Sequence, residues 1–261
     1  MTASLYPVLL ALSLAAPVPK EDRVPTAPAP RPLIQFRALH FNNAPEVASL
    51  RTVGVAEFDS AGPIERTVAV VPKMINQVAY DPTSKVLYGI SPQKVFVVAP
   101  GQADKGLLTE LLVPAELTAL RAPSGIAFDS KRERVVIAGL GGKGRMYAYT
   151  PKTGKWAELA DTTGARVAAL TYSARTDELY GVYEAPGGQV PTIGIFDPAT
   201  GKLKDEIALV DPGLPKDFGK ARRGQTTIQL AAVGNHLILL TKRQMFRFEL
   251  KTSKITVEWK K

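Results

Sequence analysis

Short apolar runs, each closed by turn-forming residues, recur from about residue 53 to the C-terminus at intervals of roughly 45 residues. In one kind of pair, an apolar strand turns through Asp, Ser or Pro into a second strand. Its copies span residues 78–90, 126–137, 170–182 and 228–240. The fourth copy turns through Gly234 and Asn235, which tolerate positive φ and suit a tight hairpin. These runs predict β-hairpins.

A second kind of hairpin alternates with the first. Its leading strands are residues 55–60, 95–100, 146–151, 193–198 and 245–250. The turns at 151–155 and 198–202 are nearly the same peptide, in which proline fixes φ for the bend and glycine supplies the left-handed residue. The last strand is expected at 255–259. Each unit is therefore predicted to be a four-stranded meander.

Repeated four-stranded units of this length are typical of propeller blades, which pack face to face because one meander cannot cover both of its faces. The aromatic-Asp-Pro, Leu-Tyr-Gly and Asp-Pro-x-Thr-Gly-Lys patterns resemble bacterial β-propeller repeats of the YVTN type and looser relatives of WD repeats. The resemblance spans roughly residues 53–260 and implies a fold, not a function. It differs from true WD repeats, since no copy has their Gly-His and Trp-Asp pairs.

The predicted fold class is all-β, a propeller of about five four-stranded blades preceded by a signal peptide and a proline-rich linker. The body, residues 33–261, is expected to be one domain. Because the last strand ends at the C-terminus, ring closure requires an N-terminal segment such as residues 33–41 to complete the first blade.

The N-terminal segment, residues 1–16, has an apolar run without charge that ends in small residues, as in an export signal. An uncleaved membrane anchor and a buried N-terminal helix are the alternatives. Residues 17–32 contain six prolines and are predicted to be an extended linker. We therefore expect a secreted, periplasmic or cell-envelope protein, with no transmembrane span once the signal is removed.

Several chemistries are excluded by composition. The chain has no cysteine, which rules out thiolate catalysis, iron–sulfur clusters and cysteine zinc sites. Of its two histidines, His236 adjoins a hairpin turn and is expected to face solvent, and His40 lies in a stretch that could be the inner strand of the first blade. Neither has marked partners for a Ser-His-Asp triad. No cofactor is expected.

Three carboxylates, Asp81, Asp129 and Asp197, recur at matching positions beside turns. Gluconolactonase-like calcium hydrolases, which this fold resembles, hold a metal with such residues at the channel mouth. The alternative, favoured here because a turn repeats in every blade and an active site does not, is that each caps its own turn. Asp177 and Glu184 in the third copy are not distinguished by the pattern. The glycine-rich residues 139–145 lack phosphate-loop spacing and are expected to join two hairpins.

The net charge of +9 favours acidic partners: anionic polysaccharide, the cell surface or acidic proteins. Nucleic acid is not expected for an exported protein. Basic clusters occur at residues 131–134, 143–145, 216–223 and 242–243. The first lies in a hairpin turn and is expected to be solvated. The longest linker, 211–225, forms a candidate binding loop; its site residues are Lys216, Phe218, Lys220, Arg222 and Arg223.

The sequence is compatible with two functions. The preferred one is an exported, non-catalytic propeller that binds a protein or an anionic glycan, with its oligomeric state left open. The alternative is a metal-dependent hydrolase or lyase with its site in the central channel. Carboxylates and amides converging at one channel mouth favour the enzyme, whereas a lining of small and apolar residues favours binding.

Overall fold

In the computed structural model, the described residues are 4–7, 34–41, 47–55, 63–72, 77–91, 94–98, 109–117, 123–139, 145–161, 166–184, 192–209, 229–240, 244–252 and 254–260. They form five four-stranded antiparallel sheets, each with its strands paired in chain order or the reverse. No helix long and apolar enough to cross a membrane occurs in these ranges. The all-β prediction is confirmed.

The first sheet, described by its backbone, contains β1 (Ser4–Pro7), β2 (Ile34–Phe41), β3 (Val47–Val55) and β4 (Pro63–Pro72). The second contains β5 (Gln77–Asp81), β6 (Val86–Ile90), β7 (Val95–Val98) and β8 (Thr109–Leu111). The third contains β9 (Pro123–Asp129), β10 (Arg134–Gly139), β11 (Arg145–Thr150) and β12 (Lys155–Asp161).

The fourth sheet contains β13 (Arg166–Ser173), β14 (Glu178–Glu184), β15 (Thr192–Phe196) and β16 (Leu203–Ala208). The last contains β17 (Gln229–Val233), β18 (His236–Leu240), β19 (Gln244–Glu249) and β20 (Lys254–Lys260). These strands confirm the repeated hairpins that the sequence predicts from residue 78 onward.

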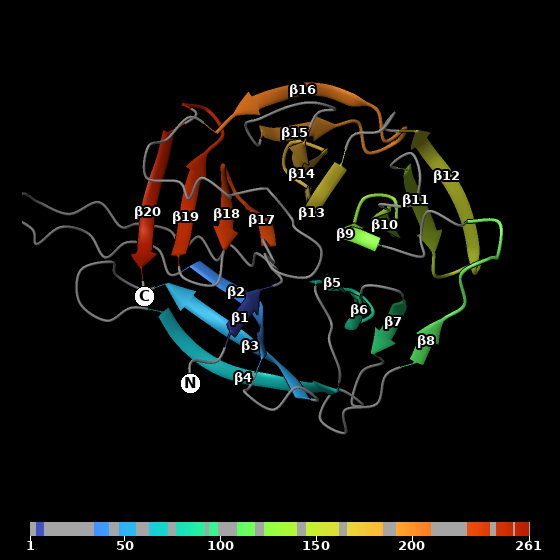
Figure 1. The fold of residues 1–261 in the computed structure, drawn as a ribbon, viewed down its shortest axis with the longest axis horizontal. Coiled ribbons are helices and arrows are strands. Elements are labelled where there is room, and N and C mark those ends of the chain that lie inside the picture. Colours follow the sequence, from blue (N-terminus) through green and yellow to red (C-terminus); the bar gives the residue numbers. More distant parts are fainter. Residues whose placement is uncertain are drawn as a thin grey trace, which may run out of the picture.

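The sheets surround a common centre, with the first strand of each sheet toward the middle and the fourth at the periphery (Figure 1). Inner strands β5, β9, β13 and β17 are neighbours in this order, and β1 contacts both β5 and β17. The four sheets from β5 to β20 are thus blades in a propeller arrangement.

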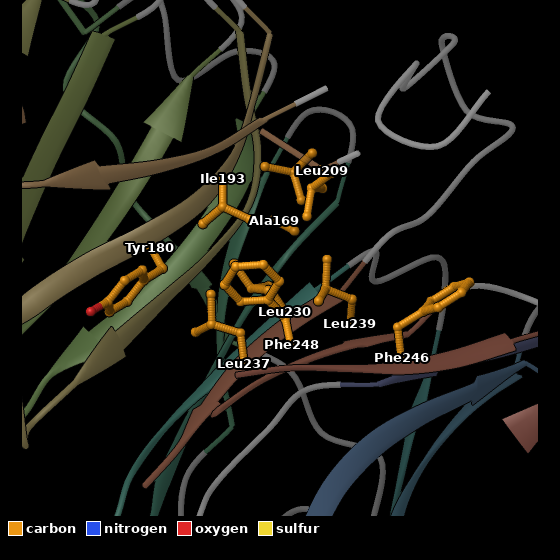
Figure 2. Packing of buried hydrophobic residues seen from close by; sticks show 10 residues of the cluster. Ala169, Tyr180, Ile193, Leu209, Leu230, Leu237, Leu239, Phe246 and Phe248 are labelled. Carbon is orange, nitrogen blue, oxygen red and sulfur yellow. The ribbon is translucent and has the colours of Figure 1, made fainter. Parts of the chain in front are cut away.

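Hydrophobic clusters fill the spaces between consecutive blades from β5 to β20. Strand β10 shows how: Val135 and Ile137 pack toward the preceding blade, whereas Val136 and Ala138 pack toward the following one. This division follows from strand geometry, because successive side chains point to opposite faces. Figure 2 shows the cluster between the last two blades, where Tyr180 and Ile193 face Leu237 and Phe248.

In the N-terminal part, one predicted strand lies mostly outside the described residues, and the predicted position of His40 differs from the structure. Strand β3 ends at Val55, and residues 56–60 of the expected strand lie outside the described ranges. His40 is on β2, the second strand of its sheet, because the inner position is taken by β1. An uncharged apolar run can pair as a strand, and periodicity alone does not reveal this. The linker, residues 17–32, is outside the described residues.

Candidate functional site: the channel mouth

The inner hairpins of three blades share one turn. Asp81, Asp129 and Ser173 end β5, β9 and β13, and each accepts a hydrogen bond from a backbone amide two or three residues later. Thr83 N lies 2.9 Å from Asp81 Oδ1, and Arg132 N lies 3.2 Å from Asp129 Oδ1. The prediction that these aspartates cap their own turns is confirmed.

The same three turns place a non-glycine residue in the left-handed region just before the second strand. Lys85, Glu133 and Asp177 have φ of 58°, 49° and 52°. Only aspartate is among the residues that tolerate this region well, so the sequence carries no clear signal for the conformation. The hydrogen bonds of the preceding Asp or Ser hold the turn despite this preference.

Asp197 caps an outer hairpin between β15 and β16. Its Oδ1 accepts hydrogen bonds from Ala199 N at 2.7 Å and Thr200 N at 3.0 Å, and Gly201 supplies the left-handed residue at φ +71°. Hydrogen bonding from the Thr200 amide is the main cause that lowers the pKa of Asp197. Within the described ranges, no group of three or more His, Cys, Asp and Glu residues is placed to hold a metal ion.

A cavity of about 390 Å³ lies where these inner strands meet their turns. Its walls come from β5, β9, β13 and β17, and much of its lining is small or apolar: Val78, Ala79, Ile126, Ala127, Leu170, Leu230 and Ala232. The turns at its edge contribute exposed residues, among them Ser130 and Arg175. Small and apolar residues, and not converging carboxylates, make up much of this lining, which favours a binding site over a metal-dependent enzyme.

Three aromatic residues occupy matching positions in the cavity wall. Tyr80, Phe128 and Tyr172 each stand immediately before the residue that caps the turn. Phe128 also stacks on Tyr88 of the preceding blade, with ring centroids 6.4 Å apart and planes 1° apart. The aromatic-Asp pattern in the sequence marks these wall residues, although its turn chemistry alone does not indicate a cavity.

Hydroxyl groups are fixed in the same wall. Thr171 Oγ1 accepts a hydrogen bond from Ala232 N of the next blade at 3.1 Å, and Ser173 Oγ accepts one from Thr176 N at 3.3 Å. Because a hydroxyl both accepts and donates, each group keeps a hydrogen to donate. The cavity therefore combines small apolar residues with polar groups, in about equal parts of its surface.

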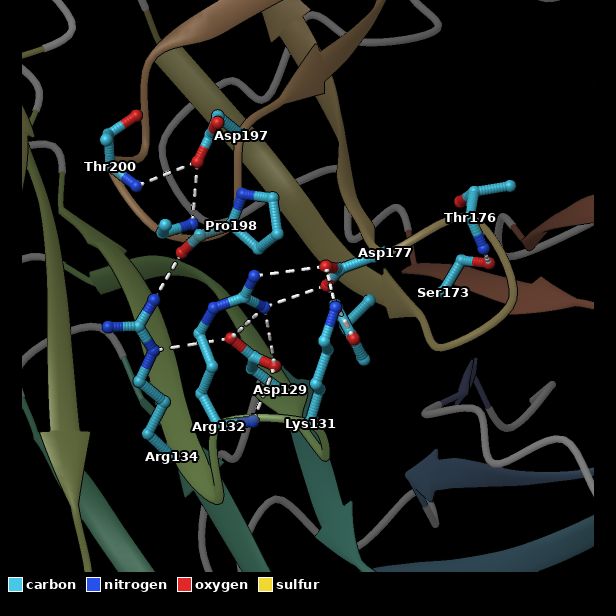
Figure 3. A network of polar contacts seen from close by, with 12 residues as sticks. Asp129, Lys131, Arg132, Arg134, Ser173, Thr176, Asp177, Asp197, Pro198 and Thr200 are labelled. Carbon is cyan, nitrogen blue, oxygen red and sulfur yellow. Dashed lines mark hydrogen bonds and ion pairs between the residues drawn. The ribbon is translucent and has the colours of Figure 1, made fainter.

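An ion-pair network beside the cavity joins two blades (Figure 3). Asp177 accepts hydrogen bonds from Arg132 Nη1 at 2.8 Å, Lys131 Nζ at 2.5 Å and the Tyr172 hydroxyl at 2.9 Å. The Arg132 hydrogen bond, followed by that of Lys131, holds the pKa of Asp177 well below its usual range. Burial, together with this carboxylate, raises the pKa of Tyr172.

Asp129 is the buried centre of the same network. Its side chain is 0% exposed and interacts with the guanidinium groups of Arg132 at 3.2 Å and Arg134 at 3.3 Å. Arg134 also donates to the carbonyl oxygen of Pro198 in the following blade. A buried carboxylate requires such partners, because its desolvation is costly.

Two sequence interpretations are corrected here. The basic cluster at 131–134 is not simply solvated, since Lys131, Arg132 and Arg134 join neighbouring blades. Asp177, which the pattern does not distinguish, pairs with Lys131 and Arg132. Asp129 pairs with Arg132 and Arg134. Reading each hairpin by itself misses contacts between residues about one repeat apart.

Asp177→Asn should make the melting temperature of the protein less sensitive to low pH. Because the folded-state pKa of Asp177 lies below the ordinary value of 3.8, its stabilising effect is full above that value and is lost as pH falls below it. The melting temperature of the wild type should exceed that of the variant at neutral pH, and the difference should shrink from about pH 4 downward. Asparagine retains the left-handed turn residue.

Thermal unfolding across pH measures this difference. Asp205→Asn removes the same charge from the exposed strand β16 and is the control. A wild-type advantage that stays constant between pH 7 and the acid limit, or one that Asp205→Asn reproduces, would contradict the assigned role of Asp177.

The other sequence candidates are placed as follows. Lys216, Phe218, Lys220, Arg222 and Arg223 lie outside the described residues, in the segment between β16 and β17. That segment leads into Gln229 at the start of β17. Residues 140–144 of the glycine-rich cluster are also outside, although the flanking strands β10 and β11 pair as expected.

His236 begins β18 and is half-buried, so it is less exposed than predicted. Burial lowers its pKa, and the nearby positive charge of Arg247 adds to the effect. The side chain of His40 is outside the described part of the structure.

Comparisons with known proteins give information on the fold of this chain but not on its function. No family model and no curated protein matches the chain. A chain in the crystal structure of a nidogen/laminin complex is 14% identical, with a TM-score of 0.51, over 81% of this chain and 89% of that chain. An auxiliary nutrient binding protein from Bacteroides ovatus is 12% identical, with a TM-score of 0.48, over 85% and 53%. At this identity the first likeness supports the propeller fold alone.

Proposed function

We propose that this chain is an exported, non-catalytic β-propeller that binds an anionic glycan. The channel-mouth cavity carries the proposal, because its lining combines small apolar and aromatic residues with hydroxyl groups and one arginine. This composition is typical of a site that recognises a ligand. The repeated carboxylates beside it are engaged by their own turns or by arginines, which leaves them as structural groups.

The basic composition supports the choice of an acidic partner. A net charge of +9 attracts polyanions over the range of the Debye length. Secretion or transfer to the periplasm or cell envelope, directed by residues 1–16, would place the protein where acidic polysaccharides occur.

The first sheet is proposed as the fifth blade. Its inner strand β1 contacts both β5 and β17, the position that a closing blade requires. Since β1 lies within residues 1–16, removal of the signal would leave β2–β4 as a three-stranded blade with a free inner edge. Sequencing the N-terminus of the exported protein distinguishes the two forms: a start near residue 17 supports cleavage, and an intact N-terminus contradicts it.

The linker between β16 and β17 is proposed as a second contact region for the same polymer. Lys216, Lys220, Arg222 and Arg223 supply positive charge, and Phe218 an aromatic group. The linker residues and the residues that line the cavity are different, so the two regions can be tested by separate variants. Long connecting loops are where propellers commonly place recognition.

Replacing Lys220, Arg222 and Arg223 together with alanine should weaken retention on an immobilised acidic polysaccharide and leave the melting temperature unchanged. A single charge pair in water contributes modestly, so we expect the three changes together to cost roughly tenfold in affinity, a loss that shrinks at high salt. Elution salt on a polygalacturonate column measures it. Unchanged retention of the triple variant would remove the linker from the site, and a wild type that fails to bind any acidic polymer would refute the proposed function.

A further inference from the structure

The positively charged side chains at the channel mouth differ in whether they already form an ion pair within the protein. Lys131 and Arg132 pair with Asp177, and Arg134 pairs with Asp129. Arg175, in the turn between β13 and β14, is exposed, lines the cavity and makes no ion pair with another described residue. Its guanidinium is available to an incoming anion.

Two carboxylates of the inner turns, Asp81 and Asp177, are already engaged by other groups. Asp81 accepts hydrogen bonds from the amides of Thr83 and Ser84 and from the Ser84 hydroxyl. Asp177, two residues from Arg175 in sequence, is engaged by Arg132, Lys131 and Tyr172. A carboxylate entering the cavity would therefore meet an arginine rather than a free carboxylate.

The cavity walls suit a ring rather than a charged group alone. Tyr80 and Tyr172 come from two blades that flank β9, and the phenol of Tyr172 is fixed by its 2.9 Å hydrogen bond to Asp177. Ala79 and Ala127 also line the cavity and add little bulk. The C–H face of a sugar ring packs well against such aromatic and small apolar surfaces, while fixed hydroxyls select its orientation.

We propose that the channel mouth binds a uronic acid residue, a six-membered sugar ring that carries a carboxylate, at an end or side group of the anionic glycan. Arg175 binds the carboxylate through paired N–H donors. Ser130 and Ser173 contact ring hydroxyls, and Tyr80 and Tyr172 flank the ring. The assignment rests on the proposed function and names the unit of the polymer that is recognised.

The size of the cavity favours one or two sugar residues over the surface of a folded protein. At about 390 Å³ it lies near the lower end of the range for small-molecule sites. A stable protein partner needs a contact area above about 1,000 Å², which a concave site of this volume does not supply by itself. An acidic protein is therefore an alternative that the experiment tests separately.

The test is calorimetric titration of the purified protein with tetragalacturonate, alongside a neutral galactose tetramer and benzoate. We expect binding of the acidic tetramer only. Arg175→Ala should weaken it by about tenfold or more, the loss typical of one charge-assisted contact, and Arg175→Lys should be intermediate because lysine keeps the charge but not the paired donors. Lys152→Ala removes an exposed charge from the β11–β12 turn and should change affinity by less than about twofold.

The outcomes separate this proposal from the function on which it rests. Binding of the acidic tetramer that Arg175→Ala leaves intact while the linker variant abolishes it would overturn the channel-mouth assignment alone. Equal binding of the neutral tetramer, or preference for benzoate, would also overturn it. No binding of any acidic glycan, with retention of an acidic protein instead, would refute both. Melting temperatures within about 2 °C of the wild type confirm that the variants are folded.

Discussion

Phe196→Ala is expected to lower the free energy of unfolding by about 4 kcal/mol. Phe196 ends β15, is 0% exposed and packs in the cluster between the third and fourth sheets. Its ring meets Tyr183 edge-on, with centroids 6.0 Å apart and planes at 70°. Truncation would remove this contact and leave a cavity that neighbouring blades cannot easily close, because each blade is held by two partners.

Chemical denaturation at equilibrium measures the effect, and Leu203→Ala is its matched control. Leu203 pairs with Phe196 across β15 and β16 but is 38% exposed, so its truncation should cost less than about 1 kcal/mol. The same ring leaves no room for a side chain at Gly194, because an added Cβ would lie 2.7 Å from it. Equal effects of Phe196→Ala and Leu203→Ala would contradict the packing of blades through β15.

Asp129→Ala is expected to destabilise the protein by about 3 kcal/mol, the cost typical of breaking a buried ion pair from one side. The change removes the fully buried carboxylate that the guanidinium groups of Arg132 and Arg134 contact. It also removes the acceptor for the Arg132 amide in the turn. Arg134 would then lack its carboxylate partner among the described residues, whereas Arg132 would keep Asp177.

Asp197→Ala is the matched control for Asp129, because both carboxylates cap a turn but Asp197 pairs with no arginine in the described residues. It should cost about 1 kcal/mol, the value of a turn hydrogen bond. Urea denaturation of both variants gives the comparison. If Asp129→Ala costs no more than Asp197→Ala, Asp129 acts only as a turn cap and the network contributes nothing.

Local chemistry explains what the sequence predicts well. The turn after Asp197 contains Pro198 and Gly201, and the structure has the expected backbone, with the Gly201 amide donating to the Asp197 carbonyl at 2.7 Å. Likewise, a continuous apolar run such as residues 135–138 identifies a strand buried on both faces. These features depend on neighbours in the chain, so one repeat is enough to read them.

Features that depend on two blades are not readable in the same way. The contact between Arg132 and Asp177 joins residues of successive repeats, and no spacing rule specifies which charged turn residues meet. Arg175 is one of many arginines in the sequence, and only the fold places it at the channel mouth. The aromatic residues before the turns could have indicated the cavity wall, since Tyr80, Phe128 and Tyr172 recur with the blade period.

The candidate site therefore depends on blade order more than on any motif. Inner strands bring equivalent residues to one mouth, where repetition builds the aromatic wall and variation among the described turns supplies Arg175. A ring of similar turns with one differing position can recognise a ligand without an assembled catalytic group.

The most direct measurement is the chain length of an acidic oligosaccharide after prolonged incubation with the protein, at a protein concentration that binds most of it and with calcium present. The account predicts that the oligosaccharide is bound and is recovered at its original length. Recovery of shorter products would show catalysis at the channel, and recovery of the whole oligosaccharide in the unbound fraction would show that the mouth is not a glycan site.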